Sequence, residues 1–457
     1  MSIVLLKGGS VVTMDPAIPN MPRGDILIED DKIAAVGADI NANDETQVID
    51  ASGMIVMPGL VNAHMHTWQT GLRGLAGNWT VLNYLRAMHA GLATFFRPDD
   101  IQIANLVGAL NQIDCGVTTL VDWHHNNPTA DHSDAAIAGL DESGIRALFL
   151  HGSAKPDPKP GQKPFSEIPM PRAEVERLRR GRFSSDDGLM SMGLAVLGPQ
   201  MSVNEVVLED FRLAREFDLI ASLHHSGAKM TAPQGYENAA QEELLSDKIN
   251  IVHGNALSDD HLQLLVDHGA TFAVTAEVEM QIAYGDPLTG RLRVLGVPMA
   301  IGSDIECAYA PDMFAIMRTT LQAERHLHSV RHIAQTGEMP HPIPLTTGEA
   351  LRWATMDGAK MAHLDHKIGS LTPGKQADVT LLRQADLNLA GVADPINGIV
   401  MHANPGNVDT VIIAGEIKKR NGQLKFDGID AKIAALGESS ARILEEFKAT
   451  APTAEFL

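Results

Sequence analysis

The sequence predicts an α/β protein in which a (β/α)8 TIM barrel carries a small β-sandwich domain built from both ends of the chain. Two observations predict this fold. Through the middle of the chain, short apolar runs alternate with helical stretches, as in repeated βα units with a parallel sheet. At both ends, shorter strand-like runs are broken by turn signals. The chain has 457 residues, and a barrel takes about 250 of them, so the length allows a second domain.

The strand-like runs at the two ends set the expected domain limits. Residues 1–57 hold several such runs, separated by glycine and aspartate pairs, and similar runs return at 377–382 and 410–414. Pairs of this kind are turn signals. We expect one composite β-sandwich from residues 1–57 and 367–425, the barrel from residues 58–366 and a C-terminal helical tail from residues 426–457.

Eight apolar runs in the middle of the chain have the length of buried strands. They are residues 55–61, 117–122, 146–150, 190–197, 219–223, 250–252, 271–274 and 298–301. Apolar residues at helical spacing fill the gaps between them, for example at 101–113 and 313–325. Eight βα units are the number that closes a barrel. A doubly wound open sheet is the structural alternative.

Charge and cysteine content restrict the partners and the kind of site. Asp and Glu outnumber Lys and Arg by 57 to 36, and the formal charge of −21 would repel nucleic acid and acidic membranes. The apolar start of the chain is too short for a signal peptide or a membrane span. Two cysteines, Cys115 and Cys307, cannot form a disulfide framework or a zinc-thiolate cluster. We expect a cytoplasmic homo-oligomer that binds a small molecule, neither nucleic acid nor membrane, and holds any metal through His and carboxylates.

Histidines follow several of the predicted barrel strands. Barrel enzymes carry their catalytic groups at the carboxyl ends of the strands. The first run leads into His64 and His66, whose imidazoles lie on one side of an extended chain and suit a single ion. The fifth, sixth and eighth runs lead into His224 and His225, His253, and Asp304. Four strand ends that deliver imidazole or carboxylate favour a metal centre.

The order of these residues resembles the amidohydrolase superfamily, and within it the branch of triazine chlorohydrolases and cytosine deaminases. The resemblance rests on V-M-P-G-L-V-N-A-H-M-H at 56–66, on the histidines after the fifth and sixth strands, on G-S-D at 302–304 and on the segment 368–378. It covers nearly the whole chain. It implies the metal ligands His64, His66, His224, His253 and Asp304, with His225 as an alternative to His224.

The resemblance also implies one divalent transition metal per chain. Some members hold two metals bridged by a Lys or Glu of the fourth strand, and residues 190–197 contain neither. Imidazole and carboxylate ligands suit zinc, and ferrous iron is the alternative. A bound ion of this kind lowers the pKa of its water to near 7. Asp304 would then accept the proton of the attacking water, and His253 would polarise the substrate, bind the metal, or do both.

One departure from the family concerns proton delivery. Deaminases of this branch carry H-x-x-E after the fifth strand, where the Glu protonates a ring nitrogen. In this chain Gly227 and Ala228 stand at the two corresponding positions, so the usual proton shuttle is absent and simple deamination is in doubt.

Carboxylates after the seventh strand are the expected replacement for that Glu. Glu277 and Glu279 share one side of an extended chain, and we expect Glu279 to project across the mouth and Glu277 to lie lower, beside the metal shell. His225 and His125 are further candidates. Alternatively, the two glutamates only pair with cations such as Arg291 or Arg293.

Aromatic and imidazole side chains near the strand ends suggest how a substrate is held. Trp68, Trp123, His125 and His151 are expected at the mouth, where stacking would suit a flat or apolar molecule. The alternative for Trp68 is that it packs the first loop. The proline-rich loop 153–171 follows the third strand and is either a lid over the mouth or a solvated excursion.

The expected function is therefore hydrolysis of a non-peptide C–N or C–Cl bond of a small, heterocyclic compound by a metal-activated water. Ring opening of a cyclic amide is one alternative, and a non-hydrolytic lyase or decarboxylase on the same barrel is another. The third alternative is a protein whose barrel serves only binding or assembly and has no catalytic activity. The ligand set argues against the third, because burying several imidazoles and a carboxylate without a metal would cost stability.

Overall fold

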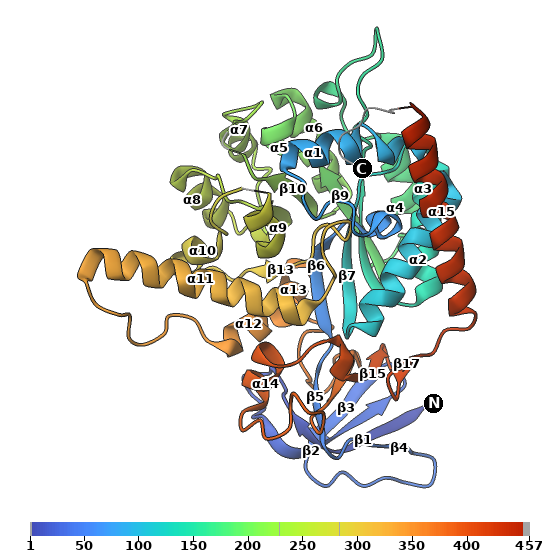
Figure 1. Cartoon of the computed structure of the whole chain (residues 1–457), viewed down its shortest axis with the longest axis vertical. Helices are drawn as coiled ribbons and strands as arrows, with labels where there is room; N and C mark the ends of the chain where they lie inside the picture. The colour runs from blue at the N-terminus through green and yellow to red at the C-terminus, as the bar shows by residue number, and fades with distance from the viewer. Residues whose placement is uncertain (1, 228, 283, 451–457) are drawn as a thin grey trace.

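The computed structural model describes residues 2–227, 229–282 and 284–450, which form two sheets surrounded by helices (Figure 1). Eight parallel strands make the first sheet, in the order β13-β12-β11-β10-β9-β8-β7-β6. They are β6 (Leu60–Met65), β7 (Val117–His124), β8 (Arg146–Gly152), β9 (Met190–Val196), β10 (Ala221–His225), β11 (Ile249–His253), β12 (Thr271–Val274) and β13 (Ala300–Ile301). All eight correspond to predicted runs.

The parallel sheet closes on itself between its first and last strands. A parallel bridge joins Met65 to Asp304, just beyond β13. The Asp304 amide donates to the His64 carbonyl at 2.9 Å, and the His66 amide donates to the Asp304 carbonyl at 2.9 Å. The predicted (β/α)8 barrel is confirmed, and its closure brings the first and eighth strand ends together.

The second sheet joins both ends of the chain, as expected. Its strand order is β17-β16-β15-β14-β5-β1-β2-β3, with β4 on β1. The strands are β1 (Ile3–Val11), β2 (Met21–Glu29), β3 (Lys32–Gly37), β4 (Gln47–Asp50), β5 (Met54–Pro58), β14 (Val379–Arg383), β15 (Val408–Ile413), β16 (Glu416–Arg420) and β17 (Gln423–Leu424). Leu6, Ile26, Leu381 and Ile412 are part of its buried core. The exact domain limits stay a prediction.

The first predicted barrel strand, residues 55–61, is split between the two sheets. Residues 55–58 belong to β5, which pairs antiparallel with β14, and β6 begins at Leu60. Gly59 is the single residue between them, and a Cβ there would lie 2.1 Å from Oγ1 of Thr118. Only glycine fits this crossing, so one short segment serves both sheets.

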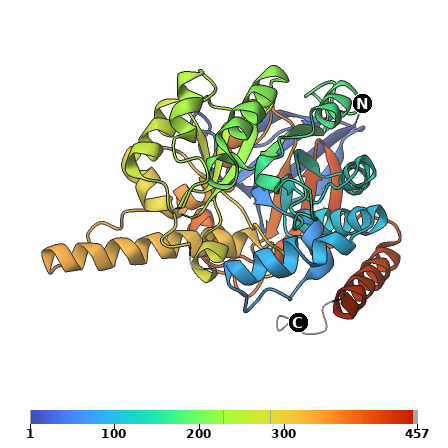
Figure 2. The ribbon, with the colours of Figure 1, turned by 90° about the horizontal axis from the view of Figure 1, so that it is seen from above.

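Helices cover the barrel between its strands. The longer ones are α2 (Pro98–Asp114), α3 (Ala130–Ser143), α4 (Arg172–Arg180), α6 (Asn204–Glu216), α7 (Gly235–Gln241), α8 (Asp259–Asp267), α10 (Thr289–Leu295), α11 (Met313–Thr336), α12 (Thr347–Trp353), α14 (Pro395–Met401) and α15 (Ile429–Thr450). Short ones are η1 (Thr67–Leu72), α1 (Val81–Tyr84), η2 (Leu85–His89), η3 (Leu92–Phe95), η4 (Phe165–Glu167), α5 (Gly198–Met201), α9 (Ala276–Gln281), α13 (Met356–Met361) and η5 (Pro405–Asn407). Seen from above, α11 extends well beyond the rest of the molecule (Figure 2).

The predicted helical tail is α15, which packs along α2 on one side of the barrel (Figure 1). Ile443 and Phe447 are buried, and the Arg442 guanidinium pairs with the Asp100 carboxylate of α2. Residues 451–457 of the predicted tail lie outside the described residues. No helix in the described ranges is both long and apolar enough to cross a membrane.

Candidate metal centre

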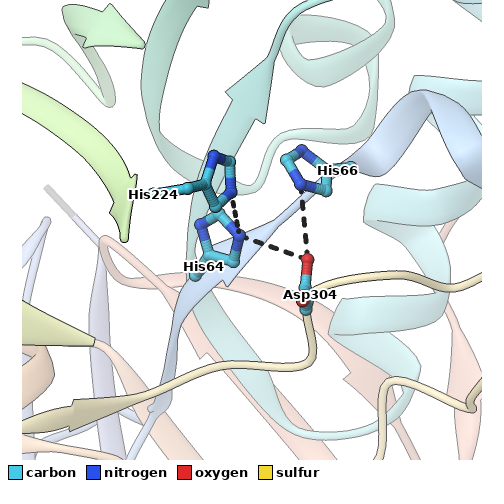
Figure 3. A group of neighbouring side chains, drawn as sticks. All are labelled: His64, His66, His224 and Asp304. Atoms are coloured by element: carbon cyan, nitrogen blue, oxygen red, sulfur yellow. Dashed lines mark hydrogen bonds and ion pairs between the residues drawn. The ribbon is translucent and has the colours of Figure 1, made fainter. Parts of the chain in front are cut away.

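Four predicted ligands meet at the carboxyl end of the barrel strands: His64, His66, His224 and Asp304 (Figure 3). One ligand atom from each lies within 4.8 Å of every other. Nε2 of His64 is 3.2 Å from Nε2 of His224 and 3.3 Å from Oδ1 of Asp304. Nε2 of His66 is also 3.3 Å from Oδ1 of Asp304. We call this group the metal cluster.

The spacing of these atoms fits a tetrahedral metal ion. Ligand atoms about 2.0–2.1 Å from a tetrahedral ion lie roughly 3.3–3.4 Å from one another, and three of the contacts in the cluster have about this length. Nδ1 of His64 is buried without a hydrogen-bond partner, so no second group draws His64 away from the cluster. Nδ1 of His66 contacts the Trp123 carbonyl at 2.7 Å, which fixes that ring with Nε2 facing the cluster.

Protonation states in the cluster also suit a cation. Burial lowers the pKa of His64 to about 4 and that of His224 well below the usual range. Burial would raise the pKa of Asp304, but contacts with His64 and His66 hold it well below its ordinary value. Neutral imidazoles beside an ionised carboxylate are the ligand forms that divalent metals require.

Strand parity selects His224 over His225. Leu223 packs in the core around the barrel, so the next side chain, His224, points inward. His225 points outward again, and its Nδ1 contacts the Tyr236 hydroxyl of α7 at 3.0 Å. The structure therefore brings His224, and not His225, to the metal cluster.

His253 stands beside the metal cluster rather than within it. Its Nε2 is 3.8 Å from Oδ2 of Asp304, and its Nδ1 is 3.3 Å from Oε1 of Glu279. Both His253 and Asp304 have left-handed backbone conformations, with φ values of 70° and 61°. Non-glycine residues adopt this conformation at a cost, commonly at functional sites. The imidazole of His253 therefore faces Oδ2 of Asp304, the oxygen that does not contact His64 or His66.

The expected positions of Glu277 and Glu279 are wrong. Residues 276–281 form helix α9 rather than extended chain, so the two carboxylates do not share a side. Glu279 is fully buried and accepts from the Thr275 amide at 2.8 Å in addition to its contact with His253. Glu277 accepts from the Thr319 hydroxyl of α11 at 3.0 Å. Neither side chain projects across the mouth. The alternative, pairing with Arg291 or Arg293, is not seen in the part of the chain that the structure describes, where Arg291 pairs with Asp259.

Aromatic side chains surround one side of the metal cluster. The ring centroid of Trp123 is 4.2 Å from that of His224, and the His125 ring is 4.3 Å from that of His66. Nε1 of Trp68 donates to Nδ1 of His125 at 3.2 Å. Trp68 is also packed edge to face on Phe96, so it both supports the first loop and orients an imidazole next to the site.

His151 does not reach the mouth, contrary to expectation. Its neighbour Leu150 packs inside the barrel, and alternation along β8 turns His151 outward. There its Nε2 contacts the Ser133 hydroxyl of α3 at 3.2 Å. The prediction was based on the position of His151 at the end of a strand. It did not take into account which side of the strand the His151 side chain lies on.

The proline-rich loop 153–171 covers part of the mouth. Its Lys155 places Nζ 5.1 Å from the centre of the Trp123 ring, while residues 156–164 are largely exposed. The loop borders a cavity of about 540 Å³ whose walls include Trp68, His89 and His125. Sequence reasoning missed both Lys155 and His89, because neither follows a strand directly.

Fold and site together define a metal-binding barrel hydrolase. A model of the amidohydrolase family matches residues 55–418, and the chain belongs to this family. It is thus an enzyme of the class that hydrolyses carbon–nitrogen bonds other than peptide bonds, as the sequence predicts. The match confirms the resemblance to amidohydrolases that the sequence shows.

Curated relatives and solved structures match along almost the whole chain. A 5-methylthioadenosine/S-adenosylhomocysteine deaminase of Caldicellulosiruptor saccharolyticus is 26% identical over 97% of this chain and 99% of its own length. A 5'-deoxyadenosine deaminase of Methanobrevibacter smithii is 27% identical, with 88% and 89% covered. Among structures, the atrazine chlorohydrolase TrzN of Arthrobacter aurescens TC1 with zinc has a TM-score of 0.83 at 21% identity, with 96% and 100% covered. An adenosine deaminase of Xanthomonas campestris with bound zinc has a TM-score of 0.79 at 22% identity, with 97% and 98% covered.

Proposed function

We propose that this enzyme hydrolyses an exocyclic or ring C–N bond of a small azaheterocycle, with His64, His66, His224 and Asp304 holding one zinc ion. The observation that carries the proposal is the convergence of three imidazoles and a carboxylate, with ligand atoms within 4.8 Å of one another, at the barrel mouth. The deaminases and the chlorohydrolase named above support the heterocyclic substrate. A zinc ion would lower the pKa of a bound water to near 7 and so supply hydroxide at neutral pH.

Asp304 is suited to take the proton of the attacking water. Oδ1 of Asp304 is shared by His64 and His66 at 3.3 Å each, whereas Oδ2 has longer contacts, 3.5 Å to Thr275 Oγ1 and 3.8 Å to His253 Nε2. Oδ2 is therefore available for a proton that moves from water toward the leaving group. Position and protonation both favour this carboxylate as the general base.

His253 would polarise the substrate from the side of Asp304. Burial alone would lower its pKa, but the Glu279 contact and the Asp304 charge raise the pKa of His253 above its ordinary value. A donating Nε2 can hydrogen-bond to a ring nitrogen or a developing anion next to the attacked carbon. We assign Glu279 to positioning His253, in place of the proton shuttle expected from the sequence.

Proton delivery in this chain must therefore differ from the H-x-x-E scheme. A Cβ on Gly227 would lie 2.6 Å from Nε2 of Gln200, and the Gln200 side chain also accepts from the Ser226 amide at 2.9 Å. Gln200 thus occupies the space toward which a longer side chain at 227 would grow. With no carboxylate there, we assign the transfers to Asp304 and His253.

The test is a screen of azaheterocycles, cyclic amides and ureas with zinc-loaded enzyme in H₂18O, read by mass spectrometry. The proposal expects a product that carries one 18O atom and has lost ammonia or opened its ring. A product that has lost CO₂ without taking up 18O would support the lyase alternative and overturn hydrolysis. Chloride loss with 18O uptake would retain hydrolysis but replace the C–N bond by C–Cl.

Zinc itself, the cytoplasmic location and a homo-oligomeric state are also part of the proposal. Elemental analysis after purification without chelators should give about one zinc per chain, and reconstitution with ferrous iron would compare the two metals directly. Light scattering coupled to size-exclusion chromatography measures the assembly. A zinc content near zero, with iron near one per chain, would replace the metal assignment.

A further inference from the structure

Lys155 is a cation without a protein counter-ion beside the site. It lies on the loop 153–171, and its Nζ stands 5.1 Å from the centre of the Trp123 ring. No ion pair or hydrogen bond reaches this ammonium from any residue within the described ranges. Its pKa falls to about 8 because burial disfavours the charged form, and no carboxylate offsets the burial. Leaving a partly buried charge unpaired costs free energy.

The cavity next to Lys155 is large enough for a substrate substituent. Its volume of about 540 Å³ falls within the range of small-molecule pockets. Four aromatic or imidazole side chains are part of its wall: Trp68, His89, Phe96 and His125. His125 lies between this cavity and the metal cluster, with its ring 4.3 Å from that of His66. The Trp123 ring beside Lys155 lies 4.2 Å from that of His224, so Lys155 is separated from the metal cluster by a single layer of side chains.

The charges around the cavity favour an anion. Besides Lys155, the walls include Lys159 and one carboxylate, Asp157. Both of these are exposed, whereas Lys155 is partly buried against Trp123. Asp157 forms no ion pair with Lys155, although the two residues are separated by only one residue in the chain. An anionic group that enters the cavity would meet a desolvated ammonium, where a charge-assisted contact is strong.

We propose that this cavity is a subsite for an anionic substituent, such as a carboxylate or phosphate group, and that Lys155 is the residue that binds it. The substrate is then a heteroaromatic ring with an acidic side group, its ring at the metal cluster and its anion on Lys155. This inference builds on the proposed hydrolysis by naming a substrate class. Binding of the anion also draws the loop 153–171 onto the mouth, since Lys155 belongs to that loop.

The experiment compares two probes of similar size on zinc-loaded enzyme by isothermal titration calorimetry: benzenesulfonate and methyl phenyl sulfone. A sulfonate is chosen because it is a poorer metal ligand than a carboxylate. We expect wild-type enzyme to bind benzenesulfonate at least tenfold more tightly than the sulfone. Lys155→Met should reduce this preference below threefold, and Lys155→Arg should retain most of it.

Lys163→Met is the matched control, because Lys163 lies on the same loop, is exposed and is not among the residues that line the cavity. It should keep the preference of the wild type. Each variant is checked for one metal per chain and an unchanged thermal midpoint. An unchanged preference in Lys155→Met, or no preference in the wild type, would overturn the subsite. Because binding is measured without turnover, a failed hydrolysis screen refutes the proposed reaction and leaves this result standing.

Discussion

Glu279 holds His253 from the side opposite to Asp304. Nδ1 of the imidazole is 3.3 Å from Oε1 of Glu279, and Nε2 is 3.8 Å from Oδ2 of Asp304. A carboxylate on one ring nitrogen fixes the orientation of the ring and the role of the other nitrogen. His253 therefore presents Nε2 to the reaction space in a defined orientation.

Glu279→Gln should lower kcat by roughly 10- to 100-fold, the usual cost of losing a partner of an active-site histidine. Gln retains the shape and the contact with the Thr275 amide but loses the charge that supports His253. Metal content should stay at one per chain, because Glu279 is not in the metal cluster. Glu277→Gln is the matched control and should leave kcat within about twofold. Equal losses in both variants would contradict a specific role for Glu279.

Variants of the two neighbouring histidines of β10, His224 and His225, should distinguish a metal ligand from a residue that only packs. His224→Asn removes an inward-facing member of the metal cluster, so we expect zinc content to fall well below one per chain and activity with it. His225→Asn removes a contact with Tyr236 on the outer side of the strand and should keep its zinc. Elemental analysis of both proteins measures this difference. Full zinc in His224→Asn with loss in His225→Asn would reverse the assignment of the ligand.

Gly302→Ala should disturb the barrel closure next to the metal cluster. A Cβ at this position would lie 2.6 Å from both the amide nitrogen and the carbonyl oxygen of His64, so the backbone must shift. We expect a loss of about 1–3 kcal/mol in the free energy of unfolding, as for other overpacked sites, together with weaker zinc binding. Gly77→Ala, where a Cβ meets nothing within 4 Å, is the control. Denaturant titration and zinc competition with a chelator measure the two effects.

Asp210 should make stability fall as the pH rises. Burial raises the pKa of this α6 carboxyl from 3.8 to about 7. Between those pH values the folded protein holds a proton that the unfolded chain has released, so the free energy of unfolding decreases with increasing pH. The upper limit of this loss is about 4 kcal/mol, at 1.36 kcal/mol per pKa unit.

Asp210→Asn should remove most of that pH dependence, because an amide still accepts from the Met170 amide, as Oδ1 of Asp210 does at 2.8 Å. Urea unfolding at pH 5 and pH 8 compares the variant with wild type. Glu205→Gln, an exposed change on the same helix, serves as control. If wild type is equally stable at both pH values while the carboxyl remains buried, the shifted pKa is refuted.

Periodicity and strand order were sufficient to predict the barrel and most of its metal cluster. For His224 the preceding core residue, Leu223, fixes the side of the strand. His64 follows Ala63, which packs inside the barrel, so alternation alone would turn His64 outward, and the register shift between Asn62 and Met65 of β6 accompanies its position in the metal cluster. The same rule, applied to His151, would have turned it outward, since Leu150 is an interior residue. That error came from using strand position without parity.

Other parts of the site depend on geometry that local sequence does not encode. His253 reaches Asp304 through a left-handed backbone, which alternation along β11 does not predict. Glu279 meets His253 because 276–281 turns into a helix where extended chain was expected. Lys155 arrives from a loop without periodicity, and its approach to Trp123 depends on how that loop folds back.

The single residue between β5 and β6 ties the metal to both ends of the polypeptide. Pro58 is paired with Val379 in one sheet, the Gly59 amide donates to the Asp378 carbonyl at 3.0 Å, and His64 lies five residues further along the chain. Asp378 in turn forms a buried ion pair with Arg146 of β8. An isolated barrel cut free of its terminal strands would lose the anchor of its first ligand-bearing strand. We therefore expect that removing the terminal strands also weakens metal binding, and that the terminal strands and the metal are lost in one cooperative transition.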